Sequence, residues 1–537
     1  MMTETLYRGI AGLFPVLLSL FAARGIFHLF QLESYQFPGY LRSVRRNPIQ
    51  IWTPGNLAAA VSMGLLALLW SLFDSLHSLA AQIVVLAGFL ALAALIGGLA
   101  ARKLKPGKAK KPFVYTARIK RLYVFCFVLL GLLSYGLSQT GSVIIAAVWP
   151  VFLPGLIAAC AFIAWGLEKI ISECYFRSAR RKLLSQKDLI RIGITGSYAK
   201  TSVKLILSTI LAEKYAVLAT PKSYNTPMGV TRAIRERLLP SHQVFIAEMG
   251  ARHVGDIREL CRLVKPKIGI LTSVGPQHLD TFKTVERVAK TKYELINALP
   301  EDGLAFFTDD GVVCRQLYDR TKTPKTLIGD EAGDADVWSE NTEISPDGST
   351  FDLCFKNGER LQVSTRLLGG HNIRNILMAA AVAKKLGLNK RQILRGIRRI
   401  EPIPSRMELI KNPNSYTIIN DGFNANPVSA KAALDILSQF PGRRIIITPG
   451  MVELGTDEAA FNKAFGKQIA GAADIAIIVG KKRAQPILDG LREAGFPQEQ
   501  IHQVDSLQQS TDVLKRLVSK DDTVLYENDL PDNYQEN

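Results

Sequence analysis

Residues 193–202 have the sequence Gly-Ile-Thr-Gly-Ser-Tyr-Ala-Lys-Thr-Ser, and this stretch decides the fold of the part of the chain around it. It follows an apolar run and precedes an amphipathic one, which predicts a strand, a glycine turn and a helix over 200–212. Backbone N–H groups at such a turn and a Lys-Thr pair at a helix start favour phosphate oxygens. A phosphate-binding loop has glycine before its lysine, whereas this chain has Ala199. An alanine in the left-handed conformation costs about 1–2 kcal/mol, which a folded domain can absorb.

Short apolar strands alternate with amphipathic helical stretches from this loop to the C-terminus. Strands are expected at 243–249, 267–274 and 303–309, and a second series begins after the Pro-rich segment 401–407. This alternation is typical of parallel α/β sheets. Between the two series, residues 336–368 change to a period of about two with Asp-Gly and Asn-Gly turns, which indicates a small antiparallel insertion.

Two polar side chains follow the expected strands. Glu248 lies at the end of the strand at 243–249, and His278 follows the strand at 267–274. The carboxyl ends of parallel strands border one crevice, so both side chains are expected to lie near Lys200. A carboxylate in this position suits a metal ion that accompanies a nucleotide.

The positive charge is concentrated near the N-terminus. The whole chain has a net charge of +19, but residues 1–190 hold 20 Lys and Arg against 6 Asp and Glu. This excess lies beside apolar segments, which indicates anionic lipid rather than nucleic acid as the partner. The six cysteines have no paired Cys-x-x-Cys spacing, which disfavours a zinc ribbon or a disulfide framework and favours a reduced compartment.

Apolar segments in the first third of the chain predict about five transmembrane helices, because a bilayer core needs about 20 apolar residues per helix. They lie at 9–30, 57–73, 80–100, 122–138 and 143–166. The loops at 31–56 and 101–121 are basic, whereas 74–79 and 139–142 contain no Lys or Arg. The positive-inside rule then places the N-terminus outside and everything after about 167 in the cytoplasm.

The expected fold is therefore an α-helical membrane region followed by an α/β part. The membrane region covers 1–166, and a basic connector covers 167–189, either along the inner leaflet or as a solvated linker helix. A P-loop parallel-sheet domain with the small antiparallel insertion covers 190–407, and a Rossmann-like α/β domain covers 408–537.

Nine motifs in order resemble the Mur ligase family, and among its members those that add D-alanyl-D-alanine to a muramoyl tripeptide. The motifs are GITGSYAKTS (193–202), SYNTPMGV (223–230), EMGARHVGDI (248–257), GPQHLDTF (275–282), AKTKYEL (289–295), GGHNIRNILMAAAVA (369–383), PIPSRMELI (402–410), NDGFNANPVSAKAAL (420–434) and GMVELG (450–455). They cover about half of the chain.

The resemblance implies an ATP-dependent ligase that converts a carboxylate to an acyl phosphate, which an amine then attacks. It implies ATP and Mg²⁺ as cofactors and a cell-envelope precursor as substrate, lipid-linked or nucleotide-linked, with other cell-wall enzymes as possible partners. With the expected spans, it also implies a multi-pass protein of a bacterial inner membrane whose catalytic domains lie in the cytoplasm. Carried onto this sequence, the residues expected around the phosphates are Gly196, Ser197, Lys200, Thr201, Ser202 and Arg406.

The same resemblance assigns the remaining site residues. Thr201, Glu248, His278 and Lys292 would hold the metal ions, with Lys292 as a carbamylated lysine. Asn372 and Asn375 would contact adenine, and Asp421 ribose or phosphate. Asn424 and Asn426 would line the place where acyl phosphate meets amine, unless the Asn-Ala-Asn-Pro stretch is only a turn. The residues alone leave simpler interpretations open: Asn372 as a helix cap, Arg406 and Asp421 as surface ion pairs, and Lys292 as a solvated charge.

Three departures from the family pattern leave the substrates open. Membrane segments occupy the place of the UDP-binding domain. The second glycine-rich turn is TPGM (448–451) where the family member has an acidic residue before Met, and the last strand ends in YENDLPDNY (526–534) where the family has a Lys-Gly-Ser turn. The alternatives are a ligase for another amine such as ammonia or glutamate, and a catalytically impaired nucleotide-binding scaffold. A transporter is disfavoured because no second nucleotide-binding domain is evident in the sequence.

Overall fold

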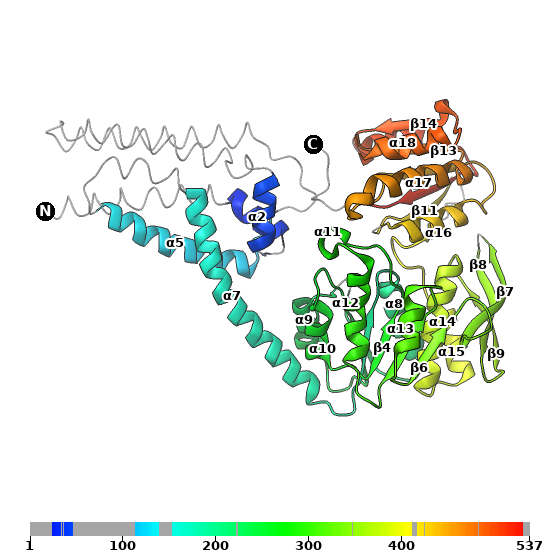
Figure 1. The fold of residues 1–537 in the computed structure, drawn as a ribbon, viewed down its shortest axis with the longest axis horizontal. Helices are drawn as coiled ribbons and strands as arrows, with labels where there is room; N and C mark the ends of the chain where they lie inside the picture. Colours follow the sequence, from blue (N-terminus) through cyan, green and yellow to red (C-terminus); the bar gives the residue numbers. More distant parts are fainter. Residues whose placement is uncertain are drawn as a thin grey trace. The chain divides into compact units, whose positions relative to one another are not determined.

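The structure is a computed structural model, and its described residues form two compact units, 1–173 and 174–537. The described residues are 24–33, 35, 37–46, 113–138, 153–221, 224–345, 347–410, 416–423, 425–481 and 483–529. Figure 1 shows the elements of each unit in the colours of the sequence.

The described part of the first unit is helical. It contains a helical stretch at 24–32 and the helices α2 (Phe37–Arg46), α5 (Ala117–Ser138) and α7 (Leu153–Leu184), whose last turns belong to the second unit. The side chains of Phe27, Ile119 and Ile157 bring the stretch at 24–32, α5 and α7 together in one apolar cluster.

One described helical segment, Gly155–Leu184 within α7, is long and apolar enough to cross a bilayer. It contains the last twelve residues of the expected span at 143–166. The expected spans at 57–73 and 80–100, and most of the span at 9–30, lie outside the described residues. The span at 122–138 lies in α5, which does not meet the same criterion. The multi-span region therefore stays a prediction.

The second unit begins with a nine-stranded sheet in the order β2-β3-β1-β4-β5-β6-β7-β8-β9. Pairing is parallel from β2 to β7 and antiparallel from β7 to β9. The strands are β1 (Ile190–Thr195), β2 (Val217–Ala219), β3 (Val244–Glu248), β4 (Ile268–Leu271), β5 (Leu304–Thr308), β6 (Lys325–Ile328), β7 (Val337–Ser345), β8 (Gly348–Phe355) and β9 (Arg360–Thr365). The parallel central sheet predicted from the sequence is confirmed. The antiparallel strands extend this sheet at its β6 edge and do not form a separate insertion.

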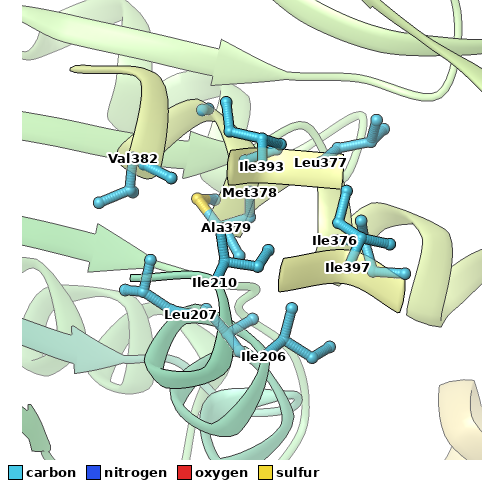
Figure 2. Packing of buried hydrophobic residues seen from close by; sticks show 14 of the residues in the cluster. Ile206, Leu207, Ile210, Ile376, Leu377, Met378, Ala379, Val382, Ile393 and Ile397 are labelled. Carbon is cyan, nitrogen blue, oxygen red and sulfur yellow. The ribbon is translucent and has the colours of Figure 1, made fainter. Parts of the chain in front are cut away.

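Helices cover both faces of this sheet, and each face has its own apolar core. On one face, α8 supplies Ile206, Leu207 and Ile210, which pack against α14 and α15, as Figure 2 shows. The opposite face is covered by the other helices, and the end of α7 packs there through Phe176 and Leu183. The helices are α8 (Lys200–Leu211), α9 (Pro227–Arg237), α10 (Asp256–Val264), α11 (Leu279–Phe282), α12 (Val285–Asn297), α13 (Val313–Arg320), α14 (Gly370–Lys385) and α15 (Lys390–Arg398).

The C-terminal sheet has the strand order β10-β11-β15-β12-β13-β14. It is parallel except for β10, which pairs antiparallel with β11. Its strands are β10 (Glu408–Ile410), β11 (Thr417–Asp421), β12 (Arg444–Thr448), β13 (Ile475–Val479), β14 (Ile501–Val504) and β15 (Thr523–Glu527), and its helices are α16 (Pro427–Leu437), α17 (Glu458–Ala472), α18 (Ala484–Glu493) and α19 (Leu507–Leu517). The predicted C-terminal α/β domain is confirmed. The short strands β2, β6, β10 and β14, each of three or four residues, were not predicted.

Candidate active site

The turn between β1 and α8 forms a tight loop around Gly196. A Cβ atom at Gly196 would lie 2.0 Å from the Thr272 hydroxyl, and its φ is 150°, so only glycine fits. Ala199 has φ 61° and ψ −2°, the left-handed conformation that the sequence analysis considered. The Ser197 N–H donates to the Ser273 carbonyl at 2.7 Å, which ties the loop to the end of β4.

Lys200, the first residue of α8, turns back over this loop. Its Nζ donates to the carbonyls of Gly196 at 2.7 Å and Ser197 at 3.0 Å. Burial lowers the pKa of Lys200 to about 8, with Glu248 acting in the opposite direction. The Lys200 amine therefore lies over the loop that would bind phosphates. A bound phosphate group would raise the pKa of Lys200 again.

Glu248 ends β3 and is the centre of a buried polar cluster. Its Oε2 accepts hydrogen bonds from the Thr201 hydroxyl at 3.0 Å and from Lys204 Nζ at 2.9 Å, and its Oε1 accepts one from Asn225 Nδ2 at 3.1 Å. Burial acts to raise the pKa of this carboxyl, but Lys204 and Lys200 outweigh it, so the pKa lies below its ordinary value. Glu248 is therefore ionised next to the hydroxyl of Thr201.

This donor set fits a magnesium ion that accompanies a nucleotide. Thr201 and Glu248 offer a hydroxyl and a carboxylate, the hard oxygen ligands that Mg²⁺ prefers. The described residues contain no group of three or more His, Cys, Asp or Glu side chains that could hold a metal by themselves. A cation here would complete its shell with phosphate oxygens and water, as Mg²⁺ commonly does.

Arg406 reaches the phosphate loop from the segment just before β10, at the junction of the two domains. Its Nη2 donates to the Thr201 hydroxyl at 3.4 Å, and its guanidinium carbon lies 4.4 Å from the centre of the Phe423 ring. Ser405 and Met407 on either side have φ of 56° and 51°, so the backbone is held in a disfavoured conformation around the residue. Arg406 is partly buried against Thr201 and Phe423, and this burial lowers its pKa. Arg406 therefore does not form the simple surface ion pair that the residues alone left open.

Asp421 ends β11 and accepts a hydrogen bond from the Met407 N–H at 3.1 Å. Its register partner on β15 is Glu527, which is fully buried. Burial raises the pKa of Asp421 to about 6, and burial together with Asp421 raises the pKa of Glu527 well above its ordinary value. The two carboxyls therefore hold a proton at pH values where ordinary carboxyls have lost it.

His278 and Lys292 lie on the β4 side of the loop. His278 is the residue before α11, and its Nδ1 contacts Oε2 of Glu453 from the C-terminal domain. Lys292 on α12 is fully buried, so the solvated-charge interpretation is wrong. Burial and then the charge of Lys200 lower the pKa of Lys292 well below its ordinary value. A neutral amine is the form that reacts with CO₂.

The two residues predicted to contact adenine pair with each other on the first turns of α14. Asn375 Nδ2 donates to Asn372 Oδ1 at 3.4 Å, and Asn372 Nδ2 donates to the Leu368 carbonyl at 2.9 Å. The helix begins after Gly369, so Asn372 is not its N-cap. Beside them, Nδ1 of His371 is a buried atom without a hydrogen-bond partner in the described structure, and burial lowers the pKa of His371 to about 4. A neutral imidazole acceptor of this kind fits an exocyclic amine of a base.

Asn424 lies outside the described residues. The neighbouring Asn426 caps α16 by accepting from the N–H groups of Val428 and Ser429, both at 3.0 Å. Ser202 is buried in α8. The structure thus brings Lys200, Thr201, Glu248 and Arg406 into direct or neighbouring contact, while Asn372 and Asn375 form a separate pair on α14.

Four residues that contact the site residues in the structure were given no role from the sequence. They are Lys204, Asn225, Glu453 and Glu527. Lys204 had a signal, since it lies one turn after Lys200 on a helix whose neighbouring residues are apolar. Glu453 lies within the GMVELG motif, but its partner His278 is 175 residues away in the chain. Contacts of such separation depend on the order of the strands, which local patterns do not reveal.

The same architecture and motifs are found in known proteins. The family profile "Mur ligase middle domain" matches residues 194–383, and "Mur ligase, glutamate ligase domain" matches 405–526. The UDP-N-acetylmuramoyl-tripeptide–D-alanyl-D-alanine ligase of Buchnera aphidicola is 31% identical over 319 residues, which cover 56% of this chain and 68% of that protein. The Escherichia coli enzyme of the same name is 30% identical over 54% of this chain and 64% of its own length.

Solved structures agree on the fold. The MurF ligase of Thermotoga maritima in complex with ADP matches with a TM-score of 0.60 and 24% identity, over 66% of this chain and 80% of that one. MurF of Acinetobacter baumannii matches with a TM-score of 0.60, 23% identity, and coverage of 66% and 77%. The chain belongs to the Mur ligase family of ATP-dependent peptide ligases.

Proposed function

We propose that this protein uses ATP to join an amine to a carboxylate of a peptidoglycan precursor, through an acyl phosphate. One observation carries the proposal: Lys200, Thr201 and Glu248 of the ATP-binding domain, and Arg406 from the junction of the two domains, surround the phosphate loop. The relatives are named as ligases of UDP-N-acetylmuramoyl-tripeptide and D-alanyl-D-alanine, and we take these as the first substrates to test.

In this mechanism the substrate carboxylate attacks the γ-phosphorus of ATP, and the bond to ADP breaks. The amine then attacks the acyl carbon and loses a proton, and inorganic phosphate leaves. The N–H groups of the Gly196–Ser197 turn and Lys200 bind phosphate oxygens, and Arg406 neutralises the charge that develops on the transferred group. Thr201 and Glu248 would hold a magnesium ion, which would supply Lewis-acid polarisation of the phosphate oxygens.

The remaining assignments follow the same family pattern. His278 and Lys292 would hold a second cation, with Lys292 carbamylated; the lowered pKa of Lys292 supports this because only the neutral amine reacts with CO₂. Asn372 and Asn375 would contact adenine, with His371 beside them, and Asp421 would contact ribose or phosphate. Asn424 would lie where the acyl phosphate meets the amine.

We also propose that the ligase is anchored in the cytoplasmic membrane through about five spans and acts on a precursor presented there. The apolar part of α7 supports one span, and its mean hydropathy is 1.6. The continuous helix runs from this apolar part into the basic turn with Arg181 and Lys182, which packs on the ATP-binding domain. Such a junction suits a membrane–cytoplasm boundary.

Two other functions remain candidates on specific observations. The strained Ala199 favours a scaffold that binds nucleotide without turnover. The buried Glu527, where the family has a basic turn, favours an amine other than D-alanyl-D-alanine, such as ammonia or glutamate.

The deciding experiment is phosphate release by the detergent-purified full chain with Mg-ATP. Nucleotide-linked and lipid-linked muramoyl tripeptides are each paired with D-alanyl-D-alanine, with single amino acids and with ammonia, and Lys200→Ala is the control. We expect release that needs both substrates and is lost in the variant. ATP binding without phosphate release on every pair would favour the scaffold. Phosphate release only with a single amino acid or with ammonia would identify that amine as the substrate in place of D-alanyl-D-alanine.

A further inference from the structure

The loop at 450–455 of the C-terminal domain lies directly on the residues that begin α11. The Leu279 N–H donates to the carbonyl of Glu453 at 3.1 Å. Gly455 has φ 69°, which favours glycine, and a Cβ atom there would lie 3.3 Å from Cβ of Leu279. The loop therefore approaches α11 closely at Gly455. The contact between the two domains is therefore formed by backbone as well as side chains.

The side chain of Glu453 points at His278. Its Oε2 contacts Nδ1 of the imidazole, and its Oε1 lies 3.9 Å from Nη2 of Arg252, which follows β3. Both side chains of the pair are about four-fifths buried, with exposed fractions of 18% for His278 and 20% for Glu453. The carboxylate therefore faces two cationic or proton-donating groups of the ATP-binding domain.

Both members of this pair have the left-handed backbone conformation, which residues other than glycine rarely adopt. His278 has φ 52° and Glu453 has φ 66°. Residues held in this way persist where the surrounding structure fixes them, and they concentrate at functional sites. The pair also borders a cavity of about 30 Å³ that is lined by Asn426 and Asn528 as well, which is large enough to hold water.

We propose that Glu453 is a positioning residue that orients His278 for a metal ion, so that the second cation position is complete only while the 450–455 loop contacts α11. The Nδ1–H of His278 donates to Glu453, which selects one tautomer and leaves Nε2 with the lone pair that a metal requires. Metal binding and the contact between the two domains are then thermodynamically linked. This inference rests on the proposed function, because it assumes that His278 is a metal ligand.

The test counts bound Mn²⁺ by electron paramagnetic resonance in the detergent-purified full chain, with an ATP analogue that carries a β,γ-methylene bridge. Glu453→Gln keeps the size of the side chain and loses its charge. Asp457→Asn is the matched control, because Asp457 is an exposed carboxylate next to the same loop. His278→Asn removes the metal ligand itself.

We expect the wild-type protein to bind two ions and His278→Asn to lose the weaker one. Glu453→Gln should weaken that second ion by about 10–100-fold, the range for residues that orient a ligand, and should leave the first ion unchanged. Asp457→Asn should bind both ions as the wild type does. Hydrogen exchange at 450–455 should slow when Mn²⁺ is added to the wild type and respond less in Glu453→Gln.

The outcomes separate the two proposals. Unchanged Mn²⁺ binding in Glu453→Gln, with the second ion lost in His278→Asn, would overturn the positioning role and leave the proposed function intact. A wild-type protein that binds a single ion regardless of His278 would overturn the metal assignment, and the positioning role with it. Thermal unfolding of each variant checks that the loss of binding is not a loss of folding.

Discussion

Replacing Lys204 by methionine should destabilise the ATP-binding domain more than most single substitutions, because it leaves Glu248 buried without its nearest cation. Lys204 Nζ lies 2.9 Å from Glu248 Oε2, and both side chains are almost entirely buried. Methionine has a similar length and no charge, so the packing of α8 is largely kept. The effect then comes from the electrostatics of the pair.

The size of the effect follows from burial. Removing one partner of a buried ion pair costs about 3–5 kcal/mol, because the remaining charge loses its compensation. The bonds from Thr201 and Asn225 to Glu248 remain and place the estimate at the lower end, about 3 kcal/mol. For a domain of this size that corresponds to a fall in Tm of roughly 6–12 °C.

The loss should depend on pH. Without Lys204, burial raises the pKa of Glu248 instead of being outweighed, and the folded state then keeps a proton that the unfolded state releases. The free energy of unfolding of the variant therefore falls as pH rises above the ordinary carboxyl range, relative to the wild type. The deficit should be smaller at pH 5 than at pH 8.

The assay is thermal unfolding of the full chain in detergent, with the double variant Lys204→Met, Glu248→Gln as the partner measurement. A neutral amide in place of the carboxylate removes the uncompensated charge, so the double variant should recover most of the lost Tm. A single variant that melts within about 1 °C of the wild type at pH 8, or a double variant that recovers nothing, would refute this account of the cluster.

Three further changes test other parts of the site. Ala199→Gly should raise Tm by about 1–3 °C. The substitution relieves roughly 1–2 kcal/mol of left-handed backbone strain, which exceeds the cost of roughly 0.5–1 kcal/mol for the added chain entropy of the unfolded state. A lower Tm in calorimetry would mean that packing of the methyl group dominates. The raised pKa values of Asp421 and Glu527 make the folded state bind more protons than the unfolded state, so the stability of the wild type falls as pH rises. Glu527→Gln should make the decrease in Tm between pH 5 and pH 8 smaller. Parallel pH profiles of Tm for the variant and the wild type would contradict the shared proton. Arg406→Ala should lower kcat about 10²–10³-fold with folding unchanged, as for loss of one transition-state donor, and steady-state phosphate release with near wild-type kcat would remove Arg406 from the mechanism.

The sequence was sufficient for the features that depend on neighbouring residues. The strand–turn–helix at 190–211 follows from an apolar run, a glycine turn and an amphipathic stretch, and the parallel central sheet follows from the alternation of such units. Glu248 was assigned to the site because it ends a strand, and strand ends of a parallel sheet share one edge. The even period at 336–368 correctly predicted antiparallel pairing, but not that β7 continues the main sheet.

The contacts that complete the site depend on tertiary structure, because they join residues that are remote in the chain. The strand order places β1 between β3 and β4, so Thr201 meets Glu248, and Ser197 meets Ser273. The ends of parallel strands predict the shared edge, but they do not give these individual hydrogen bonds. The approach of the C-terminal domain brings Arg406 to Thr201 and Glu453 to His278. The sequence by itself determined which elements form and which chemistry they carry, since hydrophobic period and turn residues act locally. Only the packed structure decided which charges face one another, since burial sets both their partners and their protonation.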